Sequence, residues 1–218
     1  DDYDTILGFV NRLADGTGGS FHDFVRAHNE HRMAVPRLVF AAQYGVQGAV
    51  DFRALAFAGN AALVGIYLLL LWVCRGSSPW KLVPLAPILF QAQCWQSLAW
   101  ATVAVQSFAV LLFALLSLYL LSVEGRAAFA GASAAASLSV LTQANGLLVF
   151  PAGALVLVLA RRTRWLVPWC ALALVVCAAY FMGYERPANH PPPSQALRDL
   201  TSLTFFLRLL GAVFEVRG

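Results

Sequence analysis

Charged residues are scarce in this sequence. Only 12% of its 218 residues are Asp, Glu, Lys or Arg, whereas 60% are hydrophobic and the mean hydropathy is +0.69. Soluble globular domains carry about 25% charged residues. Residues 82–123, 127–160 and 165–184 contain no charged residue at all. This composition excludes a soluble globular protein.

The uncharged stretches are long enough to cross a lipid bilayer. A helical crossing needs about 20 apolar residues, so residues 82–123 can hold two crossings. An outer-membrane barrel would instead alternate polar and apolar residues, and the continuous run Leu68–Leu71 does not fit that pattern. We therefore predict an all-α fold, a polytopic bundle of transmembrane helices with an outer-face loop that carries interfacial helices.

The cysteine spacing argues against a cysteine-bound metal site, and the position of the basic residues argues against a nucleic-acid-binding protein. The four cysteines have no metal-like spacing, and we expect them to be small buried hydrophobic residues. The net charge of +4 comes from basic residues in short loops between apolar runs, so we expect no nucleic-acid partner. The chain opens on Asp1 without an initiator Met or a signal peptide, and we expect it to be part of a longer protein with a crossing upstream.

The sequence divides into three regions. We predict an extracytoplasmic first loop over residues 1–54, a bundle of about six crossings over 55–184, some short or broken, and an outer loop with an amphipathic helix over 185–218. The first clear crossing runs from Leu55 to Cys74.

Hydrophobic spacing predicts three helices in the first loop. Apolar residues recur at helical spacing over residues 4–14, and a glycine-rich connector follows at 15–20. A second helix is expected over 21–32. Residues 33–50 are apolar but interrupted by a proline, an arginine and two glutamines, which favours a helix at the membrane interface.

The distribution of basic loops predicts the orientation. The loops at 75–81, 124–126 and 161–164 fall on one side if each long apolar stretch crosses twice, and they hold six basic residues against one acidic residue. That side is expected to be cytoplasmic. The remaining polar segments then meet on the outer face.

The densest of these segments is His28-Asn29-Glu30-His31-Arg32, with Arg37 shortly after it. On a helix, His28, His31 and Arg32 would share one face and could bind an anion, while Glu30 would hold Arg32 or Arg37. Two alternatives remain open. A divalent cation could bind Asp1, Asp2, His28 and His31, or the segment could be a solvated interfacial cap.

Other polar residues on the outer face are candidates for substrate binding. Amides close to Trp95 and Trp100 suit a sugar, and they equally suit hydrogen bonds between helices; they are Gln91, Gln93, Gln96, Gln143 and Asn145. Arg186 and His190 extend the positive outer face. Asp1 and Asp2 lie where an upstream crossing would emerge, as a general base, a metal ligand or a solvated end.

The order of these motifs over residues 1–160 resembles a group of bacterial multi-pass membrane proteins, which in turn resemble the C-type glycosyltransferase superfamily. Members of that superfamily take sugars from polyprenyl-phosphate carriers at the outer face. The resemblance implies a glycosyltransferase-C-like bundle, in which Asp1 or Asp2 serves as catalytic base or metal ligand. It also implies that Arg32, Arg37 and Arg186 hold the lipid-linked phosphate.

The expected function is therefore an integral-membrane glycosyltransferase of the bacterial plasma membrane, with its site facing the periplasm or exterior. It would move a hexosyl or pentosyl group from the carrier to a glycan, lipid or protein acceptor. A transporter or flippase for a lipid-linked or anionic solute, and a non-catalytic subunit of an envelope-polysaccharide complex, are the alternatives. Ionisable residues within crossings usually mark a transport path, and the predicted crossings contain none.

Overall fold

The computed structural model describes residues 3–28, 31–76, 80, 82–91, 95–184 and 204. The chain divides into two units, Asp1–Tyr184 and Glu185–Gly218, and Thr204 is the one described residue of the second unit. The predicted outer loop and helix over 185–218, with Arg186 and His190, therefore lie outside the described residues. Most of the described part of the first unit is helical, and its strands are one short pair, which confirms the all-α prediction.

Short elements before the first long helix form a small cap. These are the π-helical turn η1 (Tyr3–Leu7), helices α1 (Gly8–Ala14) and α2 (Phe21–Val25), strands β1 (Ala27–His28) and β2 (His31–Arg32), and helix α3 (Ala34–Gln47). The predicted amphipathic helix is confirmed, because Ile6, Phe9 and Val10 are buried against Phe40 of α3. The connector at 15–20 is also confirmed as a turn and loop.

The helix predicted over 21–32 is wrong beyond Val25. A capping box between Ser20 and Asp23 starts α2, but the chain then turns into two antiparallel strands, with Ala27 opposite Arg32 and His28 opposite His31. Guanidinium groups from Arg32 and Arg37, instead of further helical N–H groups, satisfy the last carbonyls of α2. Those contacts come from residues later in the chain, so helix propensity alone does not predict the end of α2.

Among the described residues, three helical segments are long and apolar enough to cross a membrane: α4 (Phe52–Val73), α7 (Ala101–Ser122) and Thr163–Phe181. The last combines the 3-10 turn η5 (Thr163–Trp165) with α10 (Leu166–Phe181). The crossing predicted at Leu55–Cys74 coincides with α4. These three segments indicate a membrane protein.

Shorter helices occupy the other predicted crossings. They are α5 (Leu85–Leu89), α6 (Trp95–Ala99), α8 (Arg126–Thr142), the 3-10 turn η4 (Ala144–Leu148) and α9 (Val149–Leu159). The total of about six crossings stays a prediction.

Small residues allow the long helices to pack closely. A Cβ atom at Gly59 of α4 would lie 2.4 Å from the backbone of Ala104 in α7. Gly153 of α9 likewise faces the buried indole of Trp169 in α10, whose Nε1 donates to the carbonyl oxygen of Phe150 over 2.9 Å. Such glycine contacts are typical of helix pairs in membranes, where close backbone approach provides the packing energy.

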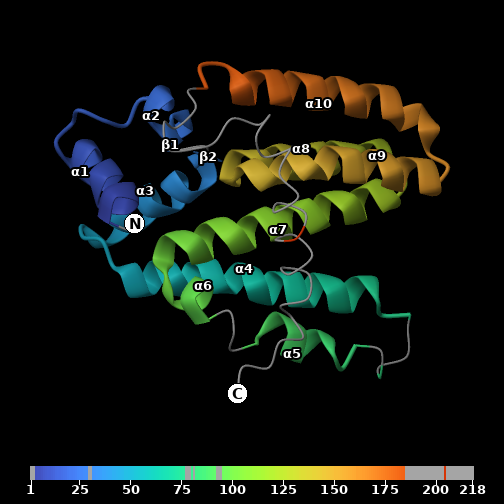
Figure 1. The fold of residues 1–218 in the computed structure, drawn as a ribbon, viewed down its shortest axis with the longest axis horizontal. Helices are drawn as coiled ribbons and strands as arrows, with labels where there is room; N and C mark the ends of the chain where they lie inside the picture. The colour runs from blue at the N-terminus through green and yellow to red at the C-terminus, as the bar shows by residue number, and fades with distance from the viewer. Residues whose placement is uncertain are drawn as a thin grey trace. The chain divides into compact units, whose positions relative to one another are not determined.

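At each end of this bundle, an arginine bonds the last carbonyl groups of a long helix. In Figure 1, the cap of short elements lies beside the start of α4 and α7 and the end of α10. Arg32 of the cap bonds the final carbonyls of α10. At the opposite end, Arg162 bonds the last turn of α7 through the carbonyl oxygen of Leu121.

Candidate functional site

The strand pair separates the residues of the His28–Arg32 segment onto two faces. Directly opposed residues of an antiparallel pair project to the same side, so His28 and His31 share one face and Arg32 projects to the other. The contacts agree: His28 meets η1, whereas Arg32 meets α10. The prediction that His28, His31 and Arg32 share one face of a helix is therefore wrong.

The histidine face carries a carboxylate and a hydroxyl. Thr5 Oγ1 lies 3.1 Å from His28 Nε2, and Asp4 Oδ2 lies 4.0 Å from the same nitrogen. Thr5 is buried and Asp4 is exposed, and both belong to the π-helical turn η1. π-Helical turns are frequent at functional sites. The cluster ties η1 to the strand pair.

The divalent-cation alternative has no support within the described ranges. Among the residues that the structure describes, no three His, Cys, Asp or Glu side chains form a group that could hold a metal ion. The alternative also requires Asp1 and Asp2, which lie outside these ranges together with Glu30. A cation site there stays a prediction.

Arg32 links the strand pair to the end of α10. Its Nε donates to the carbonyl oxygen of Tyr180 over 2.7 Å, and its Nη1 donates to that of Val25 over 2.9 Å. Its Nη2 donates to the carbonyl oxygen of Met182. A guanidinium has five N–H groups. Among the described residues, these bonds account for three of the five.

Arg37 is buried beneath the end of α2. Its side chain is 4% exposed, and its Nη1 donates to the carbonyl oxygens of Asp23, Phe24 and Arg26. Burial, and to a smaller extent the neighbouring Arg12 and Arg26, lower the pKa of Arg37 to about 10, which is still high enough for the group to stay charged at neutral pH. Arg37 was predicted to bind phosphate. In the structure, its guanidinium bonds the end of α2 to α3 within the cap.

The candidate amides fall into two groups. Gln143 ends α8 and Asn145 is exposed in η4, at the end of α8 that contacts β2. Gln96 is exposed on α6, which packs on α4 and α7, and Gln91 lies just after α5. Gln93 is outside the described residues. The structure thus brings Gln143 and Asn145, but not Gln96, to the neighbourhood of the strand pair.

An apolar groove, which the sequence did not reveal, lies beside Arg32. It has a volume of about 470 Å³, and its lining residues come from the cap, α8 and α10. Its lining residues are Phe21, Val25, Arg32, Ser137, Val140, Leu141, Val175, Val176, Ala179, Tyr180 and Met182. The Ser137 hydroxyl already donates to the Ser133 carbonyl oxygen over 3.0 Å. The groove therefore offers apolar walls and one cation.

Nothing in the uncharged stretches of the sequence indicates that some of their residues line a groove. Val175 and Val176 lie on a helix that is apolar all round, so their composition is the same as that of a lipid-facing surface. Only the packing of α8, α10 and the cap makes these side chains line a groove.

Comparison with known proteins gave no relative on which to base a function. No family model matches the chain, no curated protein matches it, and no solved structure matches it.

Proposed function

We propose that this protein is an integral-membrane glycosyltransferase of the bacterial plasma membrane that uses a polyprenyl-phosphate sugar as donor. The observation that carries the proposal is the apolar groove between α8 and α10 with Arg32 in its lining. A polyprenyl phosphate combines a long apolar chain with one anionic group. The groove has apolar walls that suit the chain and the Arg32 guanidinium, which suits the phosphate.

Size and chemistry both favour this class of ligand. Ligand sites usually have volumes of about 300–1,000 Å³ and mostly apolar walls with a few polar groups, and the groove has about 470 Å³. Among the described residues, Arg32 donates three of its five N–H groups to carbonyl oxygens. A guanidinium suits phosphate because it can donate two parallel hydrogen bonds.

The proposed reaction takes place at the end of the bundle that carries the cap. Asp1 or Asp2 accepts the proton of the acceptor hydroxyl, and the oxygen then attacks the anomeric carbon of the sugar. The bond from that carbon to the phosphate oxygen breaks, and polyprenyl phosphate leaves with the bonding electrons. Stabilisation of the leaving phosphate by Arg32 would be the main electrostatic contribution. This end of the bundle would face the cell exterior.

The double variant Asp1→Asn, Asp2→Asn is expected to abolish sugar transfer while leaving the fold and donor binding intact, because an amide cannot accept the proton. Transfer is measured by mass spectrometry of the new glycosidic product, from a polyprenyl-phosphate sugar and the purified full-length protein. Asp15→Asn, in the exposed turn after α1, is the matched control and should retain activity. Full transfer activity in the double variant would contradict the assignment of the base.

A further inference from the structure

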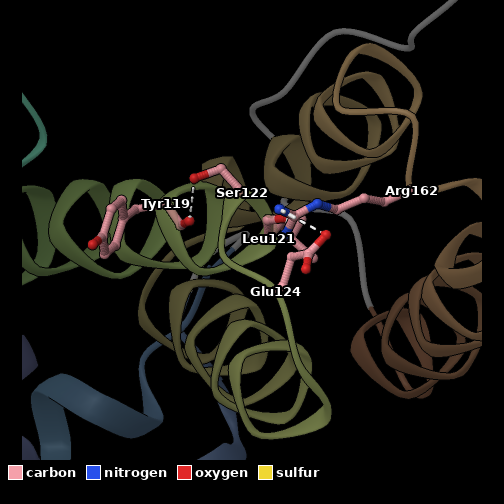
Figure 2. A network of polar contacts seen from close by, with 5 residues as sticks. All are labelled: Tyr119, Leu121, Ser122, Glu124 and Arg162. Carbon is pink, nitrogen blue, oxygen red and sulfur yellow. Dashed lines mark hydrogen bonds and ion pairs between the residues drawn. The ribbon is translucent and has the colours of Figure 1, made fainter.

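The turn between α9 and α10 holds three arginines, and Arg162 bonds to the end of α7. Arg162 Nη1 donates to the carbonyl oxygen of Leu121 over 3.2 Å, and its Nη2 lies 4.0 Å from Glu124 Oε1. Figure 2 shows this side chain reaching the last turn of α7, where Ser122 also bonds the Tyr119 carbonyl oxygen. Arg162 therefore fixes the turn to α7.

The two arginines on either side of it remain exposed. Within the described part of the chain, neither Arg161 nor Arg164 forms an ion pair with a carboxylate. Arg161 has a φ of 55°, a left-handed conformation that favours glycine. Arg164 Cζ lies 5.5 Å from the ring centroid of Trp165. The turn thus keeps an arginine where glycine would be favoured.

A third exposed arginine lies at the same end. Arg75 Cζ is 4.1 Å from the ring centroid of Trp72, and Trp72 Nε1 donates to the Tyr119 hydroxyl over 2.9 Å. Tyr119 and Leu121 belong to the same final turn of α7, so this turn joins the end of α4 to the arginines after α9. Exposed cations and tryptophan rings therefore surround one end of the membrane-crossing helices.

We propose that Arg75, Arg161 and Arg164, here called the arginine surface, bind the phosphate headgroups of anionic phospholipids. Tryptophan rings at the ends of crossings lie at headgroup depth, so the adjacent guanidinium groups lie beside lipid phosphates. Glu124 is the one acidic residue of the basic loops, and its carboxylate lies nearest to Arg162 and is not paired with Arg75, Arg161 or Arg164 among the described residues. This inference is independent of the proposed transferase activity.

The test compares lipid binding by wild type and by the double variant Arg161→Gly, Arg164→Gln. Glycine suits the left-handed position, so the variant should fold as well as wild type without added lipid. The full chain in non-ionic detergent is titrated with phosphatidylglycerol or phosphatidylcholine. Affinity is followed by thermal stabilisation and by native mass spectrometry of retained lipid. Arg53→Gln, an exposed arginine near the start of α4, is the control.

We expect phosphatidylglycerol to bind wild type more tightly than phosphatidylcholine, and the preference to weaken with added salt. Each arginine near the membrane surface is expected to change the affinity for phosphatidylglycerol about fivefold. The ratio of phosphatidylglycerol affinity to phosphatidylcholine affinity should therefore be about 25-fold lower in the double variant than in wild type. Arg53→Gln should retain it. Equal binding of the two lipids by wild type, or an unchanged preference in the double variant, would overturn the proposal. The proposal would also be overturned if inorganic phosphate alone stabilised wild type to the same extent as phosphatidylglycerol.

Discussion

Arg37→Ala is expected to lower the free energy of unfolding by about 3 kcal/mol, because it removes a buried donor from several carbonyl groups at once. The Nη1 atom of Arg37 bonds the carbonyl oxygens of Asp23, Phe24 and Arg26, and its Cζ lies 5.7 Å from the Phe9 ring centroid. Without the guanidinium, the end of α2 loses the contacts that hold it on α3.

Unfolding of Arg37→Ala is measured by denaturant titration in detergent micelles and compared with Arg26→Ala, an exposed arginine of the same segment. Arg37→Lys should fall between wild type and Arg37→Ala, because an ammonium group keeps the charge but not the planar donor geometry. If Arg37→Ala and Arg26→Ala unfold at the same denaturant concentration, Arg37 does not hold the cap together.

Gly59→Ala is expected to lower the free energy of unfolding by about 3 kcal/mol, near the upper end of overpacking costs. The new Cβ would lie 2.4 Å from the Ala104 carbonyl carbon and 2.4 Å from the Val105 nitrogen. Because those atoms belong to the backbone, no side-chain rotation can relieve the clash, and α4 must move away from α7.

Gly45→Ala is the control for this substitution. It makes the same change within a helix, α3, but a Cβ at Gly45 would meet nothing within 4 Å. Its stability should stay unchanged or rise by up to about 1 kcal/mol through the better helix propensity of alanine. A Gly59→Ala protein as stable as Gly45→Ala would contradict the close α4–α7 contact.

The spacing of apolar residues and the length of uncharged runs predicted those elements of the fold that depend on a single segment of the chain. Ile6, Phe9 and Val10 recur on one helical face, and that face is buried. The crossing over α4 follows from an uncharged run of sufficient length. The close helix contact at Gly59 could not be predicted in the same way, because an apolar helix gives no sign of which face meets another helix.

The candidate site was less predictable because its geometry depends on contacts between distant residues. Arg32 bonds the carbonyl oxygens of Tyr180 and Met182, which are 148 and 150 residues away in the sequence. The three-residue spacing of His28 and His31 fits one face of a helix, but it equally fits opposed positions of a tight strand pair. Sequence spacing alone does not distinguish these two arrangements.

The most direct test of the account is whether polyprenyl phosphate binds in the groove beside Arg32. Ala179→Trp places a large side chain in that groove from an exposed position of α10, whereas Ala178→Trp adds the same side chain at the neighbouring exposed position, which does not line it. Binding to the purified full-length protein is measured by native mass spectrometry, with polyprenol as the ligand that lacks phosphate. Losing the burial of about two methylene groups already weakens binding about tenfold.

We predict saturable binding by wild type and by Ala178→Trp, at least about tenfold weaker binding by Ala179→Trp, and weaker binding of polyprenol than of its phosphate in wild type. Equal binding of polyprenyl phosphate by Ala179→Trp and wild type would contradict the central claim that this groove holds the lipid carrier.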